Sequence, residues 1–285
     1  MMQWLARVGV VALAIIPTIG LFAPAHAHPR PDHLGAQVHG KGSEDRFHNG
    51  GRDGRAFVVT CDFSHTATVD PIVHPGDAQM SHWHTFFGNT TTNENSTGAS
   101  LLAGGTTCND PNNKSAYWVP ALYQDRVLVE PLRARVSYGR LGGDVSAFPV
   151  GFMALSGRTD DTARWGCRFP GQRPYFTSSV TQVPTCKDGA LLVAEITFGD
   201  CWDGSSLDSA DHASHVRAAV DGAGARPTCP ATHPVRVPRV RVLVEYPPAA
   251  RGGSGITLAS GDAGTLHADI FEAWVGSSLQ DRINR

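Results

Sequence analysis

The stretch VRVPRVRVLVEY, residues 235–246, alternates apolar and charged side chains over most of its length. Val240, Val242 and Val244 fall on one side of an extended chain, and charged residues fall on the other. Because side chains in a strand alternate between the two faces, this period of two predicts a half-buried β-strand.

Further runs rich in β-branched and aromatic residues predict more strands. These runs are residues 57–61, 115–119, 127–129, 132–138, 191–198, 256–258 and 266–275. The 19 prolines and 31 glycines interrupt the chain too often for long helices, and residues 208–220 are the one weak helical candidate. We therefore expect an all-β fold: a β-sandwich or jelly-roll-like single domain with long loops, stapled by disulfides.

The first 27 residues have the pattern of a secretory signal peptide. Arg7 supplies a positive charge, and the apolar segment over residues 8–22 is short for a membrane span. Small residues permit cleavage after Ala25 or after Ala27, and both sites stay open. Residues 28–55, rich in Gly, His and charge, predict a flexible arm, and residues 56–285 form the β domain. We expect a secreted, extracellular protein that has no membrane contact after cleavage.

Six cysteines, an even number, predict three disulfides in an exported chain. The chain has no Cys-x-x-Cys motif, which argues against zinc bound by thiolates. Because short loops close most easily, we expect sequential pairing. The expected pairs are Cys61–Cys108, Cys167–Cys186 and Cys201–Cys229.

The formal net charge of the whole chain is −2. A chain so close to neutrality, with its arginines spread along the predicted strands, lacks the basic surface that nucleic-acid binding requires. We therefore expect no nucleic-acid partner, and we expect a monomer.

The sharpest local motif is SHWHTFFG, residues 81–88. On a strand, His82 and His84 would share one face, with Trp83 on the other. Paired imidazoles are suited to binding a metal and to acid–base chemistry near neutral pH. The alternative is a polar face on which both histidines are hydrogen-bonded to the backbone or to carboxylates.

Three other segments carry histidines. In DHASH, His212 and His215 would be neighbours on one helical turn, with Asp211 as a ligand or an orienting carboxylate. His267 and Asp269 would share a strand face, whereas His233 precedes a proline. Each of these segments can also be read as purely structural.

Trp202 and Asp203 follow Cys201 at a predicted turn, where an aromatic face and a carboxylate suit a sugar-binding cleft. The alternative is an Asp-Gly turn beside a core tryptophan. Taken together, the expected catalytic residues are Asp203, Asp211, Asp269 and His215. The expected substrate-binding residues are Trp83, Trp118 and Trp202. The expected metal ligands are His82, His84, His212, His233 and His267.

Several segments, in this order, resemble the DUF1996 family, a domain of unknown function found in secreted fungal and bacterial proteins. They are VDPIVHPG…SHWHTFFGNT (69–90), AYWVPALY (116–123), FGDCWDG (198–204), DHASHV (211–216), CPATHPVRVPRV (229–240) and SGDAGTLHADIFEAW (260–274). The resemblance covers roughly residues 57–276, and every candidate His and Asp lies at a motif position. One departure is Ile270, where the family pattern implies an aromatic residue. The resemblance implies an extracellular setting and no particular reaction.

The function that we expect is action on polysaccharide or cell-wall glycan through a cleft rich in His and Asp. If the protein is an enzyme, a hydrolase or a lyase is expected, and one divalent metal ion is the cofactor to test for. The alternative is a non-catalytic extracellular module that binds glycan or senses cell-wall stress. The candidate residues lie far apart in sequence, so the single site requires that the fold bring them together.

Overall fold

The computed structural model describes residues 56–140, 143–220 and 227–285. The expected signal peptide, residues 1–27, and the expected arm, residues 28–55, lie outside the described residues. Among the described helices, none has the length and apolar character needed to cross a membrane.

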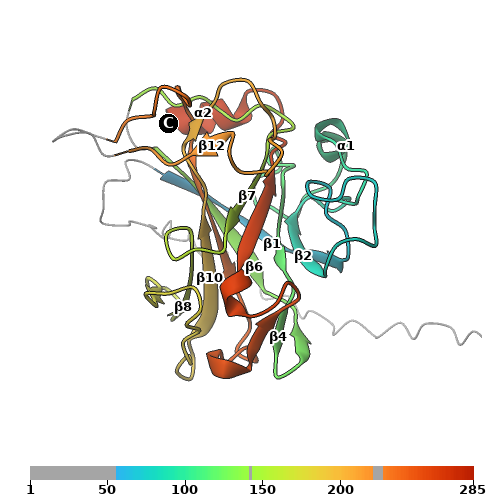
Figure 1. Ribbon diagram of the computed structural model, residues 1–285, viewed down its shortest axis with the longest axis vertical. Coiled ribbons are helices and arrows are strands. Elements are labelled where there is room, and N and C mark those ends of the chain that lie inside the picture. Colours follow the sequence, from blue (N-terminus) through green and yellow to red (C-terminus); the bar gives the residue numbers. More distant parts are fainter. Residues whose placement is uncertain (1–55, 141–142, 221–226) are drawn as a thin grey trace, which may run out of the picture. The chain divides into compact units, whose positions relative to one another are not determined.

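Ten strands of the described chain form one antiparallel sheet, in the order β7-β16-β3-β2-β1-β6-β14-β10-β8-β9 (Figure 1). Its strands are β1 (Ala56–Ala67), β2 (His84–Gly88), β3 (Ala116–Pro120), β6 (Arg133–Gly139), β7 (Met153–Gly157), β8 (Ala163–Arg168), β9 (Tyr175–Phe176), β10 (Leu191–Thr197), β14 (Arg239–Glu245) and β16 (His267–Phe271). The prediction of an all-β fold is confirmed.

Two small sheets and four short helices complete the described structure. The small sheets have the strand orders β12-β11-β13 and β15-β4-β5. Their strands are β4 (Leu122–Gln124), β5 (Val127–Val129), β11 (Cys201–Trp202), β12 (Val216–Arg217), β13 (Val235–Arg236) and β15 (Ile256–Leu258). The helices are α1 (Gly98–Ala103), η1 (Gly253–Gly255), η2 (Ala263–Thr265) and α2 (Ser278–Asn284).

Strand β14 comes from the alternating stretch of sequence and lies in the middle of the large sheet, between β6 and β10. Val240, Val242 and Val244 on its inner face are fully buried. On the outer face, Glu245 is buried as well and pairs with the guanidinium of Arg168. The predicted period of two is therefore observed, and the outer face is more covered than the sequence suggested.

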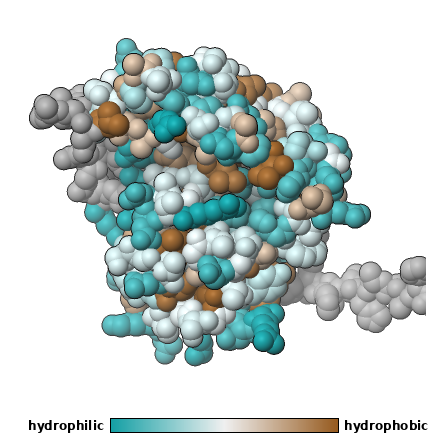
Figure 2. Space-filling model, viewed as in Figure 1, coloured by the Kyte–Doolittle hydropathy of each residue, from teal (hydrophilic) through white to brown (hydrophobic). Residues whose placement is uncertain are grey.

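The large sheet curls until its two ends approach each other. The hydroxyl of Ser156 on β7 donates a hydrogen bond of 2.7 Å to the carbonyl of Thr197 on β10. Inner-face side chains from both halves, such as Ile270, Val119 and Ile196, belong to one hydrophobic core. On the surface shown in Figure 2, apolar side chains gather only in small groups among polar ones. The main core is therefore enclosed by the curled sheet.

A second, smaller core covers part of the outer face of β2, β3 and β16. Phe86, Trp118 and Phe271 project there and pack under Leu101 of α1 and under residues 69–73 of the loop before β2. Figure 1 shows this teal loop and α1 together on one side of the sheet. This covered outer face is where the candidate site lies.

The helix predicted over residues 208–220 is wrong, because these residues form turns followed by β12. The carboxylate of Asp211 accepts a hydrogen bond of 2.8 Å from the backbone N–H of Ser214, which competes with helical hydrogen bonding. His212 has a φ of 56°, in the left-handed region that a right-handed helix excludes. In this segment, local hydrogen bonds from side chains to the backbone therefore form in place of a helix.

The three expected disulfides are confirmed: Cys61–Cys108, Cys167–Cys186 and Cys201–Cys229. They span 47, 19 and 28 residues of sequence. In the chain-entropy model, loops of this size each stabilise the fold by about 3–4 kcal/mol. Disulfides of this kind are typical of proteins in oxidising compartments.

Candidate functional site

Strands β16 and β2 place polar side chains on the covered outer face, because side chains in a strand alternate between its two faces. On β16, His267 and Asp269 point outward while Ala268 and Ile270 point into the main core. On β2, His84 points outward. Strand β3 lies between β2 and β16, with Pro120 opposite His84 and Trp118 opposite Asp269.

His82 completes a group of three imidazoles, which we call the imidazole cluster (His82, His84 and His267). The ring centroid of His82 lies 4.2 Å from that of His84 and 5.4 Å from that of His267. The predicted proximity of His82 and His84 is therefore confirmed, although β2 begins at His84 and His82 precedes it. One ligating nitrogen from each ring lies within 4.8 Å of the other two.

The hydrogen bonds of two rings fix their tautomers. Nδ1 of His84 lies 3.1 Å from the carbonyl oxygen of Val69, and Nδ1 of His267 lies 2.8 Å from that of Thr265. Because a carbonyl oxygen only accepts, both Nδ1 atoms carry the proton, which leaves the Nε2 lone pairs free. Donation from the second ring nitrogen to a carbonyl is the usual support of a metal-bound histidine.

Burial keeps these rings neutral. Burial first, and then the neighbouring His82 and His267, hold the pKa of His84 well below its usual range. Burial likewise lowers the pKa of His267 to about 4. Neutral imidazoles are the form that binds metal, so the cluster is ready to ligate at neutral pH.

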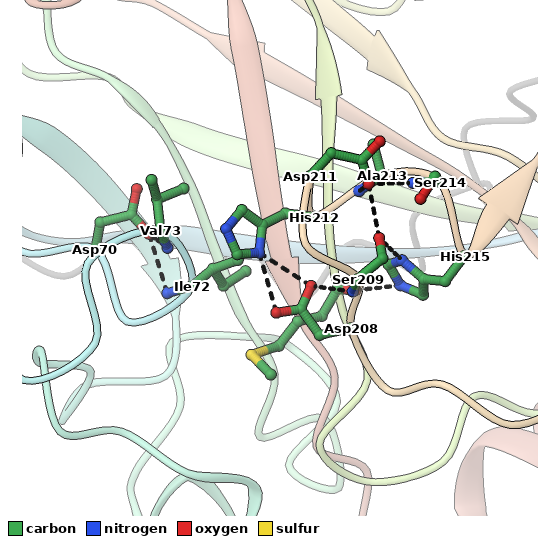
Figure 3. Close-up of polar contacts among 11 residues, drawn as sticks. Asp70, Ile72, Val73, Asp208, Ser209, Asp211, His212, Ala213, Ser214 and His215 are labelled. Carbon is green, nitrogen blue, oxygen red and sulfur yellow. Dashed lines mark hydrogen bonds and ion pairs between the residues drawn. The ribbon is translucent and has the colours of Figure 1, made fainter.

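Two aspartates meet the imidazole cluster at His84, and we call them the carboxylate pair (Asp70 and Asp269). An oxygen of each lies within 4.8 Å of the other and of a His84 nitrogen. Oδ1 of Asp70 accepts hydrogen bonds from the backbone N–H groups of Ile72 and Val73, at 3.1 and 3.0 Å, which hold the loop over the site (Figure 3). Burial first, and then the charge of Asp70, raise the pKa of Asp269 well above its usual range.

Buried polar atoms without partners concentrate here. An unpaired polar group away from water costs roughly 1–3 kcal/mol, so such groups in a native fold require a reason. Among the described residues, five of the eleven buried side-chain atoms without a hydrogen bond belong to this one neighbourhood. They are Nε2 of His82, Nε2 of His84, Nε1 of Trp118, and Oδ1 and Oδ2 of Asp269. The donor set of imidazole nitrogens and carboxylate oxygens fits a divalent metal ion.

The loop over residues 207–215 lies beside the site, along the free edge of β7. The backbone N–H of Leu155 donates to the carbonyl of His212 at 2.7 Å. The ring of His212 binds both oxygens of Asp208 through Nδ1, each at 3.0 Å, and Figure 3 shows this ring between Asp208 and the segment that carries Asp70. His212 thus borders the site without joining either metal-ligand group.

His215 and His233 hold the same loop in place. Nε2 of His215 donates to the carbonyl of Met153 at 2.7 Å, and its Nδ1 meets the hydroxyl of Ser209 at 2.9 Å. Nε2 of His233 donates to the carbonyl of Ser214 at 2.8 Å. Because these nitrogens are engaged by protein groups, the structure does not bring the six candidate histidines into one ligand set.

The carboxylates of Asp203 and Asp211 cap turns. Oδ1 of Asp203 accepts from the backbone N–H groups of Ser205 and Ser206, both at 2.8 Å. Hydrogen bonding, chiefly from Ser214, holds the pKa of Asp211 well below its usual range. Both carboxylates therefore lie outside the imidazole cluster and the carboxylate pair.

The three candidate tryptophans differ in exposure. Trp83 is 49% exposed and lies between His82 and His84 in sequence, so its ring is free to stack on a ligand. Trp118 is fully buried in the smaller core. Trp202 is half-buried, and its Nε1 donates to the carbonyl of Ser206 at 2.7 Å. Stacking on a ligand at the surface is open to Trp83 and closed to Trp118.

The sequence of the chain matches the model of a known protein family. The model of DUF1996, described as a domain of unknown function, matches residues 70–274. The chain belongs to the DUF1996 family. No curated protein and no solved structure matches the chain. The DUF1996 match begins at Asp70 and ends beyond Asp269, so it contains the whole imidazole cluster and the whole carboxylate pair.

Three residues in or beside this DUF1996 site were missed by the sequence reasoning. Asp70 stands in the VDPIVHPG motif but was assigned no role, because nothing local shows that this loop folds back over β2. Asp208 takes the orienting position beside His212 that was expected for Asp211. Arg158 lies beside His267 only through the pairing of β7 with β16.

Gly157 lies directly against the backbone of His267 in the imidazole cluster, and replacing it with alanine should destabilise the fold. Its φ is +126°, and an added Cβ would lie 2.5 Å from both Cα of His267 and the carbonyl oxygen of Leu266. We expect Gly157→Ala to lower the free energy of unfolding by about 2 kcal/mol in urea denaturation.

Gly143→Ala is the matched control, because Gly143 also has a positive φ, of +75°, with open space around its Cβ position. We expect this control to cost about 1 kcal/mol. Equal losses in the two variants would show that backbone strain alone, and not contact with His267, sets the effect.

Proposed function

We propose that this chain binds one divalent metal ion at the imidazole cluster and the carboxylate pair, and that it is a secreted enzyme acting on polysaccharide or cell-wall glycan by metal-dependent hydrolysis or elimination. The observation that carries the proposal is the convergence of imidazole nitrogens and carboxylate oxygens that are buried and have no protein partner. A divalent ion held there would polarise a substrate oxygen or a water molecule.

The residues of the chain have distinct parts in this proposal. His82, His84 and His267 supply neutral nitrogens, and Asp269 supplies a negative charge that offsets the charge of the ion. The carbonyls of Val69 and Thr265 orient two of the rings. Trp83, half exposed beside the cluster, offers an aromatic face on which a sugar ring can stack.

Secretion rests on the signal-like first 27 residues and on the three disulfides, which suit an oxidising compartment. Both observations support an extracellular substrate, and cell-wall glycan is the extracellular material that the exposed tryptophan favours.

A second candidate is a non-catalytic module in which the ion is structural. The near-complete burial of His84, His267 and Asp269 favours it, since structural metal sites are closed and catalytic sites keep an open position. His82 is only half-buried, so a substrate would reach the ion from the side of the site where His82 lies.

The test is elemental analysis of the protein after incubation with zinc, copper, nickel or manganese and removal of free ions. We expect about one equivalent of bound metal in the wild type, and none in a His82→Gln/His84→Gln variant, which keeps side-chain volume. His233→Gln is the matched control, because His233 is also buried but binds only protein groups, and it should retain the metal.

An absence of metal in the wild type with every ion would refute the metal site. With the metal-loaded protein, release of reducing ends or of unsaturated sugars from cell-wall polysaccharides would support the enzyme. Metal binding without any cleavage would favour the structural alternative.

A further inference from the structure

Arg158 is placed beside the imidazole cluster by the pairing of β7 with β16. Gly157, the last residue of β7, lies opposite His267, the first residue of β16. The backbone N–H of Arg158 then donates to the carbonyl of Leu266 at 2.7 Å. Arg158 therefore leaves the sheet next to the strand end that carries His267.

The backbone at Arg158 is strained, and its side chain is exposed. Its φ is 66°, a left-handed conformation that is uncommon for a residue with a side chain. The guanidinium of Arg158 takes part in none of the ion pairs among the described residues. Strain of this kind, when it lies at a functional group, is often part of the function.

The positive charge of Arg158 acts on the imidazoles of the site. After burial, it is the next cause that lowers the pKa of His82, and it also contributes to the lowered pKa of His267. A cation at this place repels a bound metal ion, so it weakens metal binding unless an anion is bound as well. The same charge favours the ionised form of Asp269. On its exposed side it is also placed to attract a negatively charged ligand beside the metal.

We propose that Arg158 binds an anionic group of the substrate, so that the substrate class is an acidic glycan carrying a carboxylate or a sulfate ester. The proposal rests on the proposed function, since it places the sugar between the metal site, Trp83 and Arg158. A planar guanidinium pairs with a carboxylate or a sulfate through two parallel hydrogen bonds. Arg158 is then a specificity-determining residue.

The test is calorimetric titration of the zinc-loaded protein with glucuronate, glucose 6-sulfate and glucose. We expect at least one anionic sugar to bind roughly 10–100-fold more tightly than glucose, as a charge-assisted pair with arginine implies. The two anionic sugars separate the carboxylate from the sulfate ester. Arg158→Gln should abolish the preference, and Arg158→Lys should keep part of it.

Arg126→Gln is the matched control, because Arg126 is another exposed arginine with positive φ, of 69°, in the turn between β4 and β5. It should bind like the wild type. An equal preference in Arg158→Gln and wild type, or no anion binding in either, would overturn the assignment of Arg158.

Zinc content measured on the same samples separates the two proposals. Arg158 belongs to neither ligand group, so Arg158→Gln should still hold zinc, and the metal site can stand when the role of Arg158 fails. If the wild type holds no zinc, the proposed function fails. The role of Arg158 would still be supported by an anion preference in that protein that Arg158→Gln removes.

Discussion

Asp269→Asn should stabilise the metal-free protein and abolish its stabilisation by metal. Asp269 is fully buried, both its carboxylate oxygens lack partners, and burial raises its pKa well above the usual range. At neutral pH the unfolded chain carries this carboxylate ionised, so folding either buries an unpaired charge or takes up a proton. Asparagine removes that cost, and we expect a gain of about 2 kcal/mol in the free energy of unfolding without metal.

With zinc present at about 1,000 times the dissociation constant, the wild type should gain about 4 kcal/mol. The variant should gain little, because it lacks the negative charge that offsets the ion. The measurement is urea denaturation of both proteins with chelator and with zinc. The sign of the pH dependence follows from the raised pKa. The stability that Asp269 contributes is present at acidic pH and lost as pH rises, so the advantage of the variant grows with pH.

Asp262→Asn is the control, because Asp262 is exposed and caps η2 by accepting from the backbone N–H of Gly264, which asparagine can also do. It should change neither quantity. A metal-free Asp269→Asn protein that is less stable than the wild type would contradict the view that this carboxylate is kept for a ligand.

Glu272→Gln should change the pH dependence of stability by about 3 kcal/mol. Glu272 lies just beyond β16 and is buried, with its carboxylate accepting from the hydroxyls of Ser115 and Tyr138 and from Nε1 of Trp274. Burial raises its pKa from 4.5 to about 7, against the lowering effect of these donors.

The sign follows from the raised pKa. The stability that Glu272 contributes is fully present below pH 4.5 and is lost as pH rises through about 7. The difference between the two values corresponds to about 3 kcal/mol. Glutamine does not titrate, so the stability of the wild type relative to Glu272→Gln should fall by that amount between about pH 4 and pH 8.

Other titrating groups cancel in this comparison, because both proteins carry them. The measurement is urea denaturation in chelator across that range. A relative stability that stays constant with pH would show that Glu272 titrates in the folded protein as it does in the unfolded chain.

Local patterns in the sequence predicted β1, β3, β6, β10, β14 and β16, but neither β7 nor β8, and they indicated the pairs of neighbouring site residues. The alternating valines of residues 240–244 specify a strand, because only in an extended strand do side chains two residues apart share one face. The same period places His267 with Asp269 on one face. The expectation that each cysteine pairs with the next one in sequence, which closes the shortest loops, gave the three observed disulfides.

The tertiary structure alone decided which of these pairs share a site. His82 and His84 meet His267 because β3 lies between β2 and β16. These contacts span 185 and 183 residues of sequence, which no local pattern encodes. Asp70 joins them because its loop folds over the outer face of the sheet, and Trp118 is buried for the same reason. His215 and His233 are engaged by backbone carbonyls of segments distant in sequence. Side-chain periodicity follows from the local geometry of the chain, whereas strand order and loop packing depend on how the whole hydrophobic surface is buried.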